Sequence, residues 1–140
     1  MSEENVEIVR RLYERVLAQG AVFSPATVKL LPEFFDPGVH LHQMSEIVGT
    51  RGDFHGYEGL AESAQELFAA WSDLGFIAEE IHPAGDKVAV IARAPAIGRA
   101  SGASVEWRGA HLWTLRDGRI VKWEVFDDPS EAFRAAGLSE

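Results

Sequence analysis

The sequence predicts a single α+β domain in which helices come first and a meander of long strands follows. In the first half of the chain apolar residues recur at spacings of three and four, as in amphipathic helices. In the second half they alternate with polar residues between Gly- and Pro-containing turns, as in strands. A length of 140 residues is near the usual size of one domain, so residues 1–140 are expected to form one unit.

The first half is expected to hold two longer helices and a short one. The opening helix ends near Gly20, and a short helix begins at Ser24-Pro25, because serine caps a helix and proline suits its first position. The apolar stripe of the opening helix comprises Val6, Val9, Leu12, Tyr13, Val16 and Leu17. A strand is expected at 39–44 and a polar loop at 45–55. A helix at about 56–71 follows, buried through Leu60, Ala64, Leu67, Phe68 and Trp71.

The second half is expected to form the sheet. Strands are predicted at about 76–82, 87–97, 103–115 and 119–127, separated by segments rich in glycine, proline and aspartate. A short helix is predicted at 129–136, ended by Gly137.

The hairpin at residues 116–119 determines which side chains share the inner face of this sheet. A two-residue Asp117-Gly118 turn would place His111 opposite Glu124, whereas a three-residue loop with Gly118 at positive φ would place it opposite Trp123. We predict the three-residue loop, because it separates apolar from polar residues more cleanly. The inner face then contains Trp107, Gly109, His111, Trp113, Val121, Trp123, Val125 and Asp127.

Composition excludes several classes of protein. A net charge of −9 argues against nucleic-acid binding, and no apolar run approaches the roughly 20 residues of a membrane span. The acidic N-terminus has no secretory signal pattern, and cysteine is absent, which excludes disulfides and thiolate metal sites. We therefore expect a cytoplasmic protein without nucleic-acid or membrane partners.

Several segments together resemble the nuclear transport factor 2-like superfamily, and most closely its SnoaL-like branch. These segments are the opening helix at 5–13, Phe35-Asp36-Pro37 before the strand at 39–43, residues 54–59, and the stretch from His111-Leu112-Trp113 to Asp127. The resemblance covers nearly the whole chain. It implies a cone-shaped fold in which helices and the concave face of a curved antiparallel sheet enclose a small-molecule pocket.

The resemblance also implies candidate catalytic residues. Ketosteroid isomerases of this fold use a tyrosine of the first helix, a carboxylate base on the first strand and a protonated aspartate on the penultimate strand. Tyr13, His42 and His111 match these positions. Polyketide cyclases of this fold carry a histidine where His111 lies, but Val125 occupies the position of their catalytic aspartate.

The remaining candidates each have a structural alternative. Asp127 is either a catalytic carboxylate or a cap of the last helix. Trp107, Trp113, Trp123 and Val125 are expected to contact a ligand, although tryptophans are also common core residues. His40 and His42 form a His-x-His pair that can chelate a metal, but no third ligand has a convincing spacing, so no metal site is predicted.

The function expected from these residues is cofactor-independent proton transfer on a largely apolar, carbonyl-bearing small molecule, by an isomerase, cyclase or lyase. His42 would act as the base, while Tyr13 and His111 would stabilise the developing enolate oxygen. The alternative is a non-catalytic module that binds a ligand or a partner chain. Leu112 and Phe126 among charged residues on the outer sheet face suggest a homodimer through that face.

Overall fold

A computed structural model of the chain describes residues 2–17, 31–45 and 52–138. Helix α1 (Ser2–Leu12) continues into a π-helical segment, η1 (Tyr13–Leu17), and α3 (Leu31–Phe34) precedes β1 (Phe35–Gln43). Strand β2 (Gly52–His55), helix α4 (Gly56–Ala70) and β3 (Trp71–Ser72) come next. The chain ends in β4 (Ile77–Ala84), β5 (Lys87–Gly98), β6 (Ser104–Arg116), β7 (Arg119–Phe126) and α5 (Pro129–Ala135). The predicted α+β class is confirmed, whereas the expected residues of the short helix before Leu31 and the stop at Gly20 lie outside the described residues.

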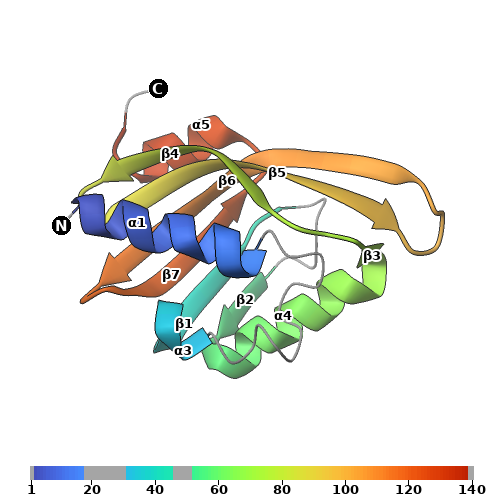
Figure 1. The fold of residues 1–140 in the computed structure, drawn as a ribbon, viewed down its shortest axis with the longest axis horizontal. Coiled ribbons are helices and arrows are strands. Elements are labelled where there is room, and N and C mark those ends of the chain that lie inside the picture. Colours follow the sequence, from blue (N-terminus) through green and yellow to red (C-terminus); the bar gives the residue numbers. More distant parts are fainter. Residues whose placement is uncertain (1, 18–30, 46–51, 139–140) are drawn as a thin grey trace.

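The strands form one curled sheet with the order β2-β1-β7-β6-β5-β3, and β4 also pairs with β5 (Figure 1). All pairs are antiparallel except β1 and β7, which are parallel, so the sheet is mixed. The antiparallel sheet that was expected therefore contains one parallel pair, because β1 and β7 run side by side in the same direction. The pairing places β1 and its histidines beside the last strand of the meander.

The inner face of the sheet is covered by α1, η1 and α4, while α5 lies on the other side (Figure 1). The predicted stripe of the first helix is confirmed, since five of its residues are at most 3% exposed: Val9, Leu12, Tyr13, Val16 and Leu17. The helix widens to π geometry at Tyr13, a type of irregularity that occurs frequently at functional sites. Among the described residues, no helix is long and apolar enough to span a bilayer.

Strand β2 corrects the prediction of a continuous loop at 45–55. Its four residues pair with β1 in the register His40–His55, Leu41–Phe54, His42–Asp53 and Gln43–Gly52. The segment is short, and only Phe54 is buried, so it lacked the apolar alternation from which strands are recognised. The pairing brings Asp53 directly opposite His42.

The hairpin between β6 and β7 has a shorter turn than predicted. Arg116 pairs with Arg119, and both Asp117 (φ 55°) and Gly118 (φ 81°) have the positive φ of a two-residue type I′ turn. A bulge at Val121 then shifts the register, so that His111 lies opposite Val125 and Trp113 opposite Trp123. The three-residue loop was therefore wrong, and so was the direct pairing of His111 with Trp123. Positive φ at Gly118 and the common inner face of His111 and Trp123 are confirmed.

Helix α5 covers the apolar centre of the outer face. Leu112 is 1% exposed and Phe126 is 7% exposed, because both pack in a small cluster with Ala89, Ala110 and Ala132. The surface that motivated a homodimer is thus occupied within the chain. The homodimer stays a prediction, but the apolar patch that suggested it is buried under α5.

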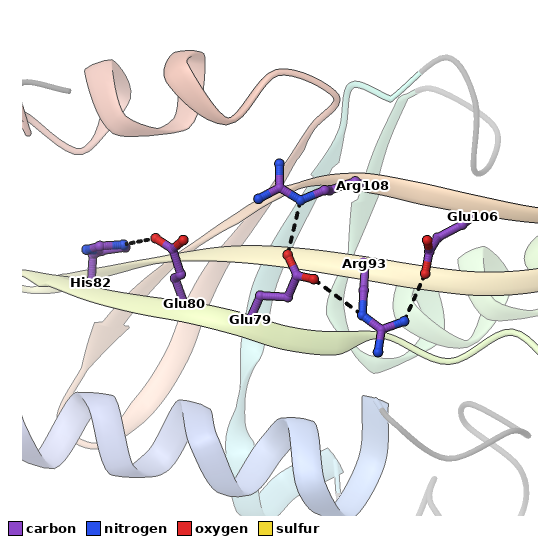
Figure 2. A network of polar contacts seen from close by, with 6 residues as sticks. All are labelled: Glu79, Glu80, His82, Arg93, Glu106 and Arg108. Atoms are coloured by element: carbon purple, nitrogen blue, oxygen red, sulfur yellow. Dashed lines mark hydrogen bonds and ion pairs between the residues drawn. The ribbon is translucent and has the colours of Figure 1, made fainter.

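Charged side chains occupy the neighbouring part of the outer face (Figure 2). Glu79 lies between Arg93 and Arg108, with N–O distances of 3.3 and 3.0 Å, and Arg93 also contacts Glu106 at 2.8 Å. These residues come from β4, β5 and β6, and their side chains are between 33% and 57% exposed. The outer face is therefore polar where α5 does not cover it.

Candidate functional site

The centre of the inner face is a hydrogen-bonded pair of side chains from distant parts of the chain. The Tyr13 hydroxyl, at the start of η1, lies 2.5 Å from Nδ1 of His111 on β6. Trp113 Nε1 donates to the same hydroxyl at 3.2 Å. Tyr13 is 3% exposed, and His111 and Trp113 are 0% exposed. The structure thus brings together two of the four expected catalytic residues in the core.

The hydrogen bonds around the Tyr13 hydroxyl favour one tautomer of His111. Because the Tyr13 oxygen accepts the indole N–H of Trp113, its own proton is best used toward Nδ1 of His111, which then carries no proton. Burial lowers the pKa of His111 to about 3, so its ring is neutral near neutrality and carries its proton on Nε2. Burial likewise raises the pKa of Tyr13 well above its ordinary value, although the bond from Trp113 opposes this. The pair is therefore a neutral donor and acceptor.

Val125 places an apolar side chain where an acidic one would stabilise a protonated His111. It is the residue directly opposite His111 on β7 and is 2% exposed. An acid here would favour the imidazolium, whereas valine leaves the ring among apolar groups. The departure from the cyclase pattern thus has a direct electrostatic consequence.

One imidazole nitrogen and one indole nitrogen in this region have no hydrogen-bond partner among the described residues. They are His111 Nε2 and Trp123 Nε1, both buried, and their rings lie 5.4 Å apart in an edge-to-face arrangement. Both carry an N–H in the arrangement above. An unpaired buried donor costs about 1–3 kcal/mol, so two neighbouring ones need a reason. The arrangement is suited to hydrogen bonding with an oxygen that enters this part of the core.

Aromatic rings from several segments of the chain surround His111. Trp107 stacks on it at 5.7 Å, Trp113 and Phe76 contact it edge-on at 5.5 and 4.9 Å, and Trp113 stacks on Trp123 at 4.6 Å. The Trp107 indole can lie along the strand because the next inner-face residue is Gly109. A Cβ on Gly109 would come within 2.4 Å of the Trp107 ring and of the Phe126 carbonyl oxygen.

Asp127 holds the outer edge of this aromatic group. Its Oδ1 accepts hydrogen bonds from Trp107 Nε1 at 2.8 Å and from Ser45 Oγ at 2.6 Å. The alternative role as a helix cap is wrong, because the cap of α5 is Asp128, which accepts from the Ser130 backbone N–H. Asp127 is half-buried and is linked to His111 through the Trp107 ring.

His42 does not lie with Tyr13 and His111. On β1 the inner-face residues are Leu41 and Gln43, which pair with Trp123 and Val125, while His42 pairs with Glu124. Side chains of adjacent residues on a strand point to opposite faces, so His42 projects from the outer face. The scheme in which His42 removes a proton from a ligand held by Tyr13 and His111 therefore does not fit this geometry.

A cleft of about 290 Å³ reaches this group from the surface between η1 and β4. Its lining includes Tyr13 and Phe76, which both contact His111. Among the expected ligand-binding residues, Trp113, Trp123 and Val125 are packed in the core at 0–4% exposure. Trp107 lines a separate, smaller hollow of about 90 Å³ with Trp71 and Leu74.

Sequence analysis missed three residues of this region. Phe76 separates the cleft from His111, and Gln43 and Ser45 are buried polar residues beside Asp127, joined by a bond from the Ser45 backbone N–H to Gln43 Oε1. Gln43 could have been found, because it is a polar residue on a strand face with Val39 and Leu41. Ser45 and Phe76 carry no local signal, since their positions depend on how distant segments meet.

The architecture agrees with the comparisons to known proteins. The sequence profile of the SnoaL-like domain matches residues 9–123. The chain therefore belongs to the SnoaL-like branch of the nuclear transport factor 2-like superfamily, as the sequence resemblance implied. No curated protein sequence matches the chain.

Solved structures show the same fold at low sequence identity. A protein of Jannaschia sp. CCS1 described as a SnoaL-like polyketide cyclase is 24% identical, with a TM-score of 0.73 over 89% of this chain and 85% of that one. TerC, co-crystallised with polyporic acid, is 20% identical, with a TM-score of 0.73 over 95% and 97% of the two chains. A Catenulispora acidiphila protein with a ketosteroid isomerase-like fold, in complex with trimethylamine, is 15% identical, with a TM-score of 0.69 over 94% and 93%.

Proposed function

We propose that this protein binds a small, largely apolar molecule with a carbonyl oxygen and catalyses proton transfer on it without a cofactor, as an isomerase, cyclase or lyase. The observation that carries the proposal is the pair of unpartnered, buried nitrogens His111 Nε2 and Trp123 Nε1. Membership of the SnoaL-like family supports a small-molecule ligand, and TerC, a protein of similar fold, was co-crystallised with an organic compound.

In this proposal the ligand oxygen accepts hydrogen bonds from His111 Nε2 and Trp123 Nε1. Such donors stabilise the negative charge that develops on a carbonyl oxygen when a proton leaves the adjacent carbon. The Tyr13 hydroxyl is already engaged with His111 Nδ1, so Tyr13 acts through the histidine and is a positioning residue. The Tyr13 bond holds the His111 proton on the nitrogen that would meet the ligand.

The ligand would enter through the cleft between η1 and β4. Phe76 lines this cleft and packs edge-on against His111, so rotation of its ring would join the cleft to the buried nitrogens. The surrounding tryptophans would contact the apolar body of the ligand and exclude water. A volume of about 290 Å³ is at the lower end of the range for small-molecule sites.

Asp127 is the proposed base in place of His42. It is the carboxylate that hydrogen-bonds Trp107, whose ring stacks on His111. It stands just past the end of β7, two residues beyond Val125, which occupies the aspartate position of the cyclases that this chain resembles. A carboxylate there can take a proton from a carbon held over the Trp107 ring.

A non-catalytic ligand-binding module is the second candidate. It is favoured by Val125 and by the lowered pKa of His111, because a histidine with a pKa of about 3 is a weak base near neutrality. In this alternative the same two N–H groups hold a ligand oxygen, and Asp127 only orients Trp107.

One experiment tests the proposal and separates the two candidates. The ligand is first identified by native mass spectrometry of purified protein and confirmed by titration with the wild type and His111→Phe. Hydrogen–deuterium exchange at the carbon next to the ligand carbonyl is then followed by NMR in D₂O. Exchange that Asp127→Asn abolishes while binding persists supports catalysis, whereas binding without exchange supports the module. Binding that His111→Phe leaves unchanged contradicts both.

A further inference from the structure

Three side chains that commonly bind metals meet on the outer face, at the edge of the sheet. His40 and His42 lie on β1 and Asp53 lies on β2. Asp53 Oδ1 is 2.6 Å from His40 Nε2 and 2.8 Å from His42 Nδ1, and the three potential ligand atoms lie within 4.8 Å of one another. The missing third ligand of the His-x-His pair is thus Asp53, which the sheet register supplies.

We propose that His40, His42 and Asp53 form a binding site for a divalent transition metal ion such as Zn²⁺. Two imidazole nitrogens and one carboxylate oxygen are a donor set that suits zinc, cobalt, nickel and copper better than magnesium or calcium. The site is separate from the inner-face pocket of the proposed function, because its side chains project from the other side of β1. The metal site can therefore be disproved without affecting the proposed function of the inner-face pocket, and the reverse also holds.

The backbone holds these ligands in place before any ion binds. His42 and Asp53 are direct cross-strand partners, and His40 is two residues from His42 on the same strand face. Tetrahedral zinc with bonds of about 2.0–2.2 Å places its ligand atoms roughly 3.3–3.6 Å apart. Small side-chain rotations from the present distances of 2.6 and 2.8 Å, with no backbone change, would open this space.

A third imidazole, that of His55, lies next to the three ligands. His55 pairs with His40 across the strands, and their rings stack at 4.7 Å with an interplanar angle of 12°. It can support the orientation of His40, as residues around metal ligands commonly do. The side chains of the three ligands are 32%, 37% and 51% exposed for His40, His42 and Asp53 respectively, so a remaining coordination position would open to solvent.

The electrostatics of the group agree with cation binding. Because one oxygen of Asp53 contacts both imidazoles, three potential metal-ligand atoms lie close together. An ion at that point would bind the nitrogens that now face Asp53, after each neutral ring has moved its proton to its other nitrogen.

The outer face also offers a matched control. His82 Nε2 lies 2.9 Å from Glu80 Oε1, at similar exposure, so this pair has one histidine and one carboxylate but no second imidazole. Two ligands on flexible exposed side chains should hold an ion much more weakly than three ligands. If simple ion pairing explains both groups, they should behave alike.

The test is calorimetric titration of Zn²⁺ into the full-length, untagged protein and three variants, each checked for folding by circular dichroism. We expect one high-affinity site in the wild type and in His82→Ala. His42→Ala and Asp53→Asn should each weaken that site by at least about tenfold. Bound Co²⁺ should give the visible absorption of a tetrahedral site in the wild type and in His82→Ala only. The proposal is overturned if the wild type binds no Zn²⁺ stoichiometrically, or if His42→Ala and Asp53→Asn bind as tightly as His82→Ala.

Discussion

Histidines on the two faces of the sheet have opposite environments. His111 on the inner face is fully buried among four aromatic rings, bonds one tyrosine and has a pKa of about 3. His40 and His42 on the outer face are about one-third exposed and share one carboxylate oxygen. The same side chain is therefore a neutral hydrogen-bonding group on one face and a candidate metal ligand on the other.

The comparison shows that strand parity and register decide the chemistry available to each residue. His42 and Gln43 are neighbours in sequence, yet one meets Asp53 in solvent and the other is 5% exposed in the core. The contributions of these residues to the free energy of unfolding should also differ between the two faces. Substitutions on the inner face should change stability strongly, and substitutions on the outer face should change it little.

The largest loss of stability is expected for Trp113→Ala. Trp113 is 0% exposed, stacks on Trp123 and donates to Tyr13, so truncation removes packing and leaves a cavity. We expect the free energy of unfolding to fall by about 3–5 kcal/mol in urea denaturation. A loss below about 1 kcal/mol would mean that the inner face is loosely packed.

A smaller loss is expected for Gly109→Ala. The new Cβ would meet the Trp107 ring and the Phe126 carbonyl oxygen at 2.4 Å, so the indole must move away from His111. We expect a loss of about 2–3 kcal/mol. The control is Gly118→Ala, where no atom lies within 4 Å and only the positive φ is strained, at about 1 kcal/mol. Equal losses for the two variants would contradict the close contact with Trp107.

The pH dependence of stability should depend on His111. Its pKa is about 3 in the folded chain and about 6.5 when unfolded, so the unfolded state binds the extra proton as pH falls below about 6.5. The folded state should therefore lose up to about 1.4 kcal/mol of stability per pH unit, which amounts to roughly 1.6 kcal/mol between about pH 6.5 and pH 5.

Comparison with His111→Phe isolates this contribution. The variant should unfold within about 1–2 kcal/mol of the wild type at neutral pH, because it keeps the shape of the ring. Its stability should decline less between the same two pH values. Parallel curves for the two proteins would show that His111 does not titrate as a buried group.

The smallest effect is expected in the charged network of Figure 2. Glu106→Gln removes one exposed contact to Arg93, at 2.8 Å, and should cost less than about 1 kcal/mol, less still at high salt. A loss of more than about 2 kcal/mol would show that the outer face contributes as much as a core residue.

Much of the fold could be predicted from the sequence because it depends on local patterns. The helix stripe through Tyr13, the long strands and the shared face of His111 and Trp123 follow from apolar periodicity. The strand at Gly52–His55 and the bulge at Val121 could not be predicted, because they are fixed by pairing with partners distant in sequence or by the sheet's twist.

The candidate site, like the fold, could be predicted only in part from the sequence. The meeting of Tyr13 and His111 followed from matching two segments to a family, and the structure confirms the contact. The position of His42 was assigned by resemblance alone, without weighing its strand parity against Leu41 and Gln43, and this placed it on the wrong face. The His40 and His42 pair was recognised from the sequence, but no metal site was predicted, because Asp53 lies on a strand that was taken for a loop.

The most direct test of the account is ¹⁵N NMR of the imidazole of His111, assigned by comparison with His111→Phe, at about pH 5. We predict a neutral His111 ring at this pH, with Nδ1 unprotonated and accepting from Tyr13 and with the proton on Nε2. In Tyr13→Phe the Nδ1 resonance should shift, because its hydrogen bond is lost. A protonated imidazolium at about pH 5, or a neutral ring with its proton on Nδ1, would contradict the proposed donor and the site built on it.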